Sequence, residues 1–205
     1  AIDPSISEPS ESLQLKFDAE VTTLIENSPA NDDLEIGPDG FLYGSDVLDG
    51  GSALNGKKIY RFNIVDGSHT VYAEGLNVPI GNAFDSNGNL FVSNFNGASV
   101  SKIDNNQQTT SFSTGLSGAS GLVIDSSDNI YVALYNSNSI KKISPDGTIS
   151  DVVSGNGLNG PVGITYDTDE NIYVANYNDG KIFKIEKGTS TLTQLTQITG
   201  PSVGF

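Results

Sequence analysis

The chain has 205 residues, which is enough for one all-β domain with a shared core, and two independent domains are not required. Its 25 acidic and 10 basic residues give a formal charge of -15, so general attraction to nucleic acid or to an anionic membrane is disfavoured, and cations and neutral ligands are easier partners. Cysteine is absent, which excludes disulfides, thiolate metal sites and cysteine nucleophiles.

The first residues of the chain indicate where in or outside the cell the protein is found. The sequence starts Ala1-Ile2-Asp3 without methionine, as a processed product would, and no apolar run approaches the length of a membrane span. We therefore expect no membrane span and a secreted or periplasmic protein. Residues 1–12 are rich in serine, proline and acidic side chains and are expected to form a disordered lead-in, and residues 13–205 are expected to form a single domain.

A segment centred on an aromatic residue recurs along the chain. The four copies centre on Tyr43, Phe91, Tyr131 and Tyr173, which are 48, 40 and 42 residues apart. A period of about 41 residues explains these spacings if residues 47–56, which are rich in glycine, form an inserted loop. Such a period indicates a repeat architecture, and we expect the four aromatic side chains to be equivalent and largely buried.

Each period contains four short runs with strand character, in the same order. The first run begins with glycine, at 81, 121 and 163, and a tight turn follows it. The second run carries the aromatic residue and is apolar throughout, as expected for a blade that packs on both faces. The third ends in an apolar-x-basic-apolar pattern, and the fourth is rich in serine and threonine, which suits an exposed edge. The sequence therefore predicts an all-β β-propeller of four-stranded antiparallel blades, with four complete blades between about 31 and 199.

Two copies of the second run carry a family resemblance. Residues 88–94 (GNLFVSN) and 171–176 (NIYVAN), each preceded by a glycine-led run and followed by an apolar-x-Lys-Ile run, resemble NHL repeats and the related SMP-30/gluconolactonase propellers. The resemblance covers about 31–199 and implies a ring that usually has six blades. Tryptophan is absent, which argues against a WD-type propeller.

Both ends of the chain match parts of further blades. Residues 15–17 and 21–25 resemble the third and outermost strands of a blade, and residues 200–205 resemble the opening of the last blade at 160–164. Four blades cannot close a six-bladed ring, and an open array exposes an apolar face at each end. Three arrangements would cover these faces: a longer chain, a distorted five-bladed ring, or a homo-oligomer. We favour a sequence truncated at its C-terminus whose open ends drive association.

The resemblance also implies a place for a metal ion. In SMP-30-like hydrolases, an acidic residue near the end of a second strand and an asparagine before the glycine of an inner strand help to hold a metal in the central channel. Here the positions before the glycines are Ile80, Ser120 and Val162, which departs from that pattern. A partial acidic cluster is left in the first blade, and we expect at most one Ca²⁺ there. Its candidate ligands are Asp33, Glu35 and Asp46, beside Asp32.

The hairpin turns and the ten basic residues offer further sites, each with a structural alternative. The turns at 85–89, 125–129 and 167–171 alternate oxygen-bearing residues as calcium loops do, but aspartate and asparagine also suit tight hairpins, and we favour turn chemistry. Five basic residues recur at one repeat position: Lys16, Arg61, Lys102, Lys142 and Lys184. We expect them to pack their stems on the blades rather than to form a ring for an anionic ligand.

Polar and aromatic residues at the end of the second strand are the candidate ligand site. Asn94, Tyr135, Asn176 and Tyr177 would suit a sugar-like ligand through hydrogen bonds and ring stacking. The alternative is that the asparagines close turns and the aromatic rings pack between blades. The one histidine, His69, is expected on an outer turn, so no histidine triad can form within the chain.

The leading functional hypothesis is a non-catalytic extracellular module that binds a small molecule, a glycan or a protein of neutral or cationic character. The alternative, which rests on the resemblance, is a divalent-metal-dependent hydrolase of lactones or related esters. A third reading is a structural module cut from a larger polypeptide.

Overall fold

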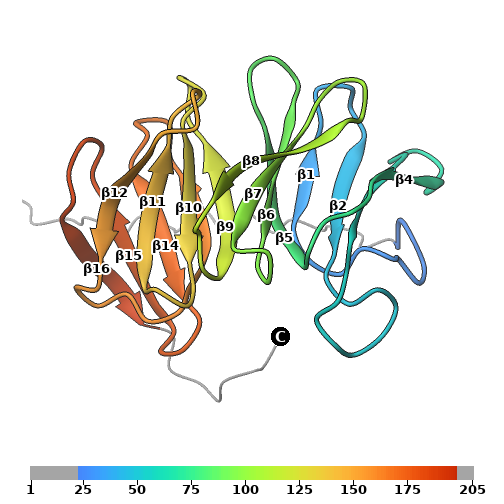
Figure 1. Cartoon of the computed structure of the whole chain (residues 1–205). Coiled ribbons are helices and arrows are strands. Elements are labelled where there is room, and N and C mark those ends of the chain that lie inside the picture. The colour runs from blue at the N-terminus through green and yellow to red at the C-terminus, as the bar shows by residue number, and fades with distance from the viewer. Residues whose placement is uncertain (1–22, 198–205) are drawn as a thin grey trace, which may run out of the picture.

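The computed structural model describes residues 23–197, and its strands form four four-stranded antiparallel sheets (Figure 1). In each sheet the strands follow one another in chain order. The bounds are β1 (Leu34–Ile36), β2 (Leu42–Asp46), β3 (Lys58–Phe62) and β4 (His69–Ala73) in blade 1; β5 (Pro79–Phe84), β6 (Leu90–Asn94), β7 (Ser99–Ile103) and β8 (Thr109–Thr114) in blade 2; β9 (Ala119–Ile124), β10 (Ile130–Leu134), β11 (Ser139–Ile143) and β12 (Ile149–Ser154) in blade 3; and β13 (Pro161–Tyr166), β14 (Ile172–Asn176), β15 (Lys181–Ile185) and β16 (Leu192–Gln197) in blade 4.

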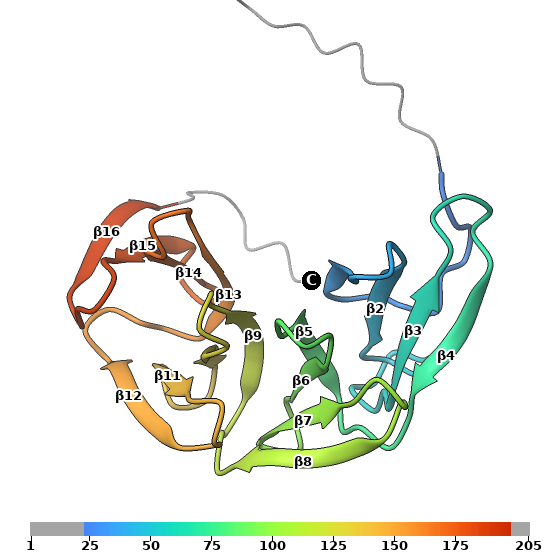
Figure 2. The same cartoon turned by 90° about the horizontal axis from the view of Figure 1, so that it is seen from above.

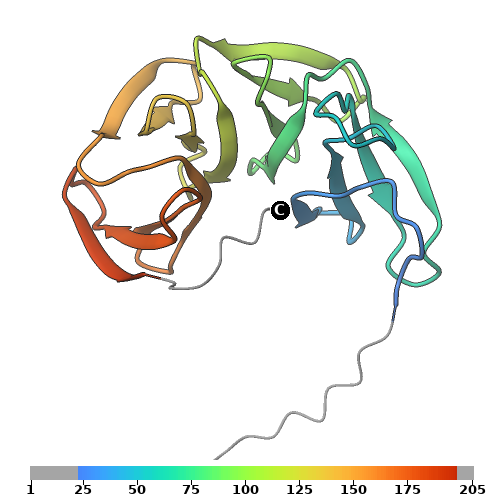
Figure 3. The same ribbon diagram turned by 90° about the horizontal axis from the view of Figure 1, so that it is seen from below.

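The four blades stand side by side in an arc. Figures 2 and 3 show the inner strands β1, β5, β9 and β13 turned toward a common axis and the outer strands β4, β8, β12 and β16 along the periphery. The predicted fold class and the four complete blades are confirmed. None of the described residues forms a helix of the length and hydrophobicity that would cross a bilayer.

Some sequence predictions fall on the chain ends. The lead-in at 1–12 and the partial strands at 15–17 and 200–205 lie outside the described residues. Residues 23–25, which were expected to finish an outermost strand, are not in a strand. They pass beside the β3–β4 turn instead, since a Cβ on Gly67 would lie 2.7 Å from the Leu24 carbonyl oxygen.

The repeated aromatic residues occupy equivalent positions, as predicted. Tyr43 pairs with Arg61 on the third strand of its blade, and the three later copies pair with Lys102, Lys142 and Lys184. Tyr43 and Phe91 are buried, whereas Tyr131 and Tyr173 are half-buried. For Tyr173 the reason is its place on the outer face of blade 4, which no other blade among residues 23–197 covers.

The basic partners of these rings lie on the blades, which supports their structural role. Lys102 Nζ lies 5.6 Å from the centroid of the Phe91 ring, and Lys142 Nζ lies 5.7 Å from that of Tyr131. Arg61 stacks on Phe41, with 3.3 Å between its guanidinium carbon and the ring centroid. Their apolar stems and cation–π contacts therefore belong to the blade faces.

The hydrophobic core is divided among the joints between blades. One cluster joins blades 1 and 2 through residues such as Tyr43 and Leu90, a second joins blades 2 and 3 through Phe91 and Leu122, and a third joins blades 3 and 4. A blade therefore becomes stable by packing on its neighbours rather than by itself.

In the part of the chain that the structure describes, no blade packs on the outer faces of blades 1 and 4. Leu34 and Ile36 on β1 are 56% and 57% exposed, and Leu195 on β16 is 50% exposed. Phe84 has the same register in β5 as Ile36 has in β1, and it packs edge-on against Tyr43 at 4.9 Å. The exposed residues at both ends thus occupy positions that inner blades use for packing.

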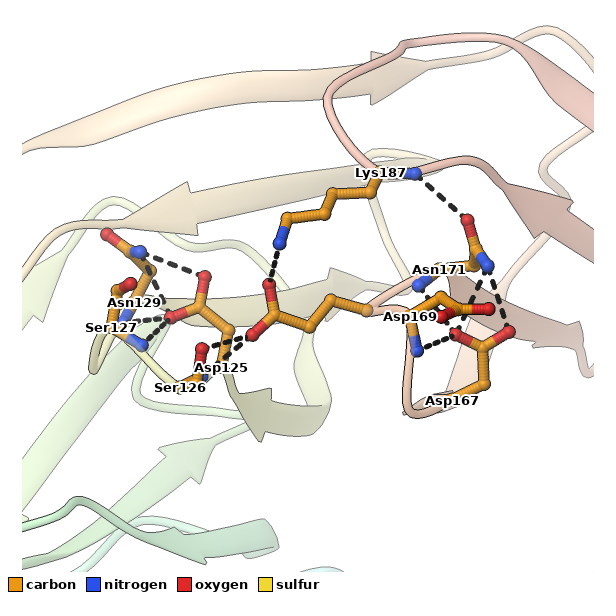
Figure 4. A network of polar contacts seen from close by, with 9 residues as sticks. Asp125, Ser126, Ser127, Asn129, Asp167, Asp169, Asn171 and Lys187 are labelled. Atoms are coloured by element: carbon orange, nitrogen blue, oxygen red, sulfur yellow. Dashed lines mark hydrogen bonds and ion pairs between the residues drawn. The ribbon is translucent and has the colours of Figure 1, made fainter.

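The hairpin turns satisfy their own aspartates, as the turn interpretation predicts. Asp125 accepts hydrogen bonds from the backbone N–H groups of Ser127 and Asn129 and from the Asn129 side chain, and Asp167 does the same with Asp169 and Asn171 (Figure 4). Asp85 repeats the pattern in blade 2. These carboxylates are therefore used locally to hold the turns.

Neighbouring turns are also bonded to each other. The Ser86 N–H and hydroxyl donate to Asp128 at 2.8 and 2.6 Å, which links blade 2 to blade 3. The Ser126 N–H and hydroxyl donate in the same way to Glu170, which links blade 3 to blade 4. Lys187 completes this second link with an ion pair to Glu170 at 2.6 Å.

The Glu170 link predicts a pH-dependent stability. Hydrogen bonds from Lys187 and Ser126 lower the pKa of Glu170 to about 2, below its value in the unfolded chain. The resulting stabilisation is present above the ordinary glutamate pKa and is lost as the pH falls from about 4.5 toward 2. We expect Glu170→Gln to reduce the free energy of unfolding at pH 7 and to have little effect on it near pH 2. Urea denaturation at the two pH values measures this difference.

The matched control is Asp169→Asn, which changes an exposed neighbour on the same turn. The control is expected to leave the free energy of unfolding nearly unchanged at both pH values. An equal loss for Glu170→Gln at both pH values would contradict the proposed linkage.

Candidate functional site

A row of aromatic rings crosses three blades at the ends of their second strands. The rings belong to Phe95, Tyr135 and Tyr177, and their centroids are 5.8 Å apart for the first pair and 6.1 Å for the second. Each backbone N–H donates to the segment that leads into the inner strand of the same blade, on the carbonyls of Val78, Gly118 and Gly160. The repeat therefore places the three rings in sequence along one rim, and we call them the ring row.

Glycine permits the close approach of the loops within the ring row. Gly160 has a φ of 61°, and a Cβ there would lie 2.7 Å from Cε2 of Tyr135. A side chain at this position would therefore displace the Tyr135 ring.

Polar groups lie beside the rings. The Tyr135 hydroxyl donates to Asn178 Oδ1 at 3.0 Å, and the Asn178 amide donates to Asn159 Oδ1 at 3.1 Å. Tyr135 is half-buried and Tyr177 is 43% exposed. The ring row thus offers partly exposed aromatic surface with amide groups at its edge.

Asn94 and Asn176 lie inside the loops and not on the ring row. They are 2% and 4% exposed. Asn94 accepts from the Asn77 N–H and donates to Ser101, and Asn176 donates to the Gly157 carbonyl and to Asp179. Their position matches the alternative in which these asparagines close turns, so only the two tyrosines of the predicted ligand set share an accessible surface.

The channel side of blades 1 and 2 brings together Asp33, Glu35 and Asn82. Asp33 Oδ2 accepts from the Asn82 N–H at 2.7 Å. Asn82 is 2% exposed, and its Oδ1 is buried without a hydrogen-bond partner. All three residues line a cavity of about 380 Å³ whose other walls come from β9 and β13. The cavity thus holds two carboxylates together with a residue whose amide oxygen has no partner, and such oxygens are ligands that a cation prefers.

The electrostatics of this site agree with that chemistry. Burial raises the pKa of Asp33, although the N–H groups of Asn82 and Leu34 oppose the rise. Burial also raises the pKa of Glu35, and the charge of Asp33 adds to the increase. Burial raises the pKa of Asp32 as well, with a further contribution from Asp33. Protons or a cation would relieve the cost of holding these carboxylates close together.

Asp46 lies apart from the other two predicted metal ligands. The Ser45 N–H donates to the Asp33 carbonyl, so Ser45 is opposite Asp33, and the next residue in the strand faces the other way. The Asp46 carboxylate accepts from the N–H groups of Leu48 and Asp49 and so begins the inserted loop at 47–56. Within residues 23–197, no group of three or more histidine, aspartate and glutamate side chains is arranged to hold a metal ion.

Asn82 was missed by the sequence reasoning, although it has a signal. It follows Gly81, at the position that Leu122 and Ile164 occupy in the later blades. A single polar residue at an otherwise apolar inner position marks a site whose partner lies in another blade.

The histidine has no part in either site, since His69 opens β4 and its ring lies 5.4 Å from that of Phe62.

These features define a β-propeller with two carboxylates, Asp33 and Glu35, on its channel side and with the ring row at the ends of its second strands. Residues 10–155 match the family profile described as SMP-30/Gluconolactonase/LRE-like region, and the chain belongs to this family. A comparison with curated proteins gives no match.

Solved structures share the fold at low sequence identity. The chain is similar to the selenomethionine-substituted virginiamycin B lyase from Staphylococcus aureus, with a TM-score of 0.67 and 21% identity over 82% of this chain and 56% of the lyase. A catalytically inactive variant of that lyase, crystallised with quinupristin, gives a TM-score of 0.69 and 21% identity over 91% of this chain and 62% of the lyase. A protein described as a candidate gluconolactonase gives 0.68 and 12% over 87% and 67%. The chain thus spans 56–62% of the length of the lyase structures.

Proposed function

We propose that this propeller is an extracellular recognition module that binds a neutral or cationic ligand, preferably a glycan, at the ring row. The observation that carries the proposal is the alignment of Phe95, Tyr135 and Tyr177 on three successive blades, with centroid spacings near 6 Å. Aromatic faces pack against the apolar faces of sugar rings, and the amides of Asn159 and Asn178 lie close enough to bond hydroxyl groups. The net charge of -15 favours a neutral or cationic partner over an anionic one.

The ring row predicts which variants lose binding. On an array of neutral oligosaccharides, Tyr135→Ala and Tyr177→Ala are expected to weaken binding by roughly tenfold each, because each removes one stacking surface. Val65→Ala is the control, since Val65 is 89% exposed on an outer turn far along the chain from the ring row. Retention of full binding by both tyrosine variants would refute the site.

The second candidate function is a divalent-metal-dependent hydrolase of lactones or related esters. The observation that favours it is that Asp33, Glu35 and Asn82 line one cavity and that the Oδ1 of Asn82 has no hydrogen-bond partner. These three residues would hold the ion, and a divalent cation bound there would polarise a substrate carbonyl and lower the pKa of a bound water. The lyase and the candidate gluconolactonase among the similar structures add support for an enzyme on this fold.

The cation site is tested by its proposed ligands. Calorimetry with Ca²⁺ is expected to show one binding event that Asp33→Asn abolishes, because this change removes a carboxylate at the site. Asp46→Asn is the matched control, because the Asp46 carboxylate hydrogen-bonds to its own loop. This variant is expected to leave Ca²⁺ binding unchanged. Equal binding by the wild type and Asp33→Asn would dismiss the site.

The exposed end faces support a proposal about assembly. Two copies of the chain would associate with Leu34 and Ile36 of one copy against Leu195 and Tyr173 of the other, in the manner of the internal joints. Burial of a few hundred Å² at roughly 25 cal/mol per Å² gives several kcal/mol before the cost of association.

Light scattering over a concentration series measures this association. The wild type is expected to increase in mass with concentration, and Leu34→Asp or Leu195→Asp is expected to stay monomeric, because each places a charge on an apolar contact face. A wild type that remains monomeric throughout would contradict the proposal.

A further inference from the structure

The joint between blades 1 and 2 differs from the other two joints at the turns. At joints 2–3 and 3–4, a serine at the second turn position donates to an acidic residue at the fourth position of the next turn. At joint 1–2 the corresponding residues are Pro38 and Gly88. Proline has no N–H and glycine has no side chain, so this hydrogen-bonded link is missing.

A cleft lies where the link is missing. Its volume is about 370 Å³, and Pro38 and Gly88 are both part of its wall. A Cβ on Gly88 would lie 3.8 Å from Pro38 Cγ and 3.1 Å from Asn105 Oδ1. A side chain at position 88 would therefore enter the space that Asp128 fills at the next joint.

Aromatic rings form the floor of the cleft. Tyr43 packs edge-on against Tyr72 at 4.8 Å and against Phe84 at 4.9 Å. Tyr43 is buried and the other two rings are half-buried. The floor is therefore firm, and part of its apolar surface remains open to a ligand.

A preformed polar group makes one wall. Arg61, the chain's one arginine, donates from Nε and Nη2 to Asp39 at 2.9 and 2.7 Å and from Nε to the Tyr43 hydroxyl at 3.1 Å. The Tyr43 hydroxyl donates to the same Asp39 oxygen. Burial opposes ionisation of Asp39, but the hydrogen bonds from Arg61 and Tyr43 outweigh it and keep the Asp39 pKa below its ordinary value. The pair is thus fixed, ionised and neutral as a unit.

Further polar groups line the cleft around this pair, and one of them, Asn105, donates from its amide to the Asn87 carbonyl at 3.1 Å. Arg61 Nη1 has no protein partner among residues 23–197, and the side chains of Asn105, Gln107 and Thr70 are exposed at the rim. Donors and acceptors therefore line the cleft beside the aromatic rings, and the Arg61–Asp39 pair adds no net charge. This combination suits adjacent hydroxyl groups, each of which donates and accepts, and it gives no advantage to an anion or a cation.

We propose that the cleft between blades 1 and 2 is a second ligand site that binds a neutral sugar residue. Its volume lies at the lower end of the range for small-molecule pockets, which fits one or two sugar rings. The cleft is separate from the ring row, because it lies at the turn ends of β2 and β6 while the ring row follows the opposite ends of the second strands on blades 2 to 4. Sugar binding in the cleft is a further activity, and it does not depend on ligand binding at the ring row.

The chain itself supplies the variants that test the cleft. Replacing Pro38 by Ser and Gly88 by Asp installs the pair that links blades 2 and 3, and Asp128 shows that aspartate adopts the required backbone at a φ of 60°. This double variant is expected to fold, because Asp128 holds the same turn position with a left-handed backbone, and to fill the cleft. Arg61→Lys keeps the charge but removes the planar fork, and it is expected to fold because Lys102 occupies this position in blade 2.

The measurement is a protein-observed NMR titration with D-glucose, D-galactose and N-acetylglucosamine, each up to about 50 mM. At least one sugar is expected to shift the backbone amides around Arg61, Gly88 and Asn105. The double variant is expected to lose these shifts, and Arg61→Lys is expected to weaken the affinity roughly tenfold. Asp169→Asn, an exposed change on a turn of blade 4, is expected to leave the affinity unchanged. If a trisaccharide binds more tightly than the monosaccharides, the ligand is a sugar residue within a glycan chain. If the affinities are equal, the ligand is the free sugar.

Three results would overturn the proposal. The first is the lack of shifts at these amides with all three sugars, and the second is the same shifts in the double variant. The third is a response to inorganic phosphate in place of the sugars, which would make the cleft an anion site centred on Arg61.

Discussion

The packing of one blade on the next is the interaction on which the rest of the structure depends. A four-stranded blade has two apolar faces, and the hydrophobic clusters lie at the joints between blades rather than within one sheet. Leu90, for example, is fully buried on blade 2 by residues of blade 1. The ring row, the channel cavity and the cleft are all consequences of this packing, since each forms where neighbouring blades meet.

Small changes of sequence at equivalent joint positions decide what each joint does. A serine and an acidic residue fasten the turns of blades 2, 3 and 4, whereas proline and glycine leave a cleft beside blade 1. Asn82 replaces an apolar residue of the later blades and brings an unpaired oxygen next to Asp33. Functional variety thus enters this repeat through single substitutions at the joints, while the strands keep their register.

The family comparison agrees with this division between frame and sites. The chain belongs to the SMP-30/gluconolactonase/LRE-like family and shares its fold with the lyase structures. Identities of 12% to 21% are enough to preserve the blades, since these need only the pattern of apolar and turn residues. The particular side chains on the rim, in the channel and in the cleft must be judged from this chain alone.

The sequence by itself determined the blades, because their features are local. The aromatic residues at 43, 91, 131 and 173, the glycine-led inner runs and the aspartate turns each depend on residues within one period of the chain, and the predicted strands and turns are present. Tyr135 and Tyr177 share a repeat position, and their rings accordingly lie next to each other.

Only the tertiary structure decided which polar groups meet. Asp33 and Asn82 are 49 residues apart, and Ser86 and Asp128 are 42 apart, so their contacts depend on how one blade is rotated against the next. The direction of a single side chain was equally out of reach. Asp46 was grouped with Asp33 because it ends the second strand of the same blade, but the alternation of the strand turns it to the opposite face and into its own loop. Asn94 and Asn176 were assigned to the ligand surface because each directly precedes an aromatic residue at the end of a second strand. Hydrogen bonds to the interior of the loops hold both asparagines away from that surface.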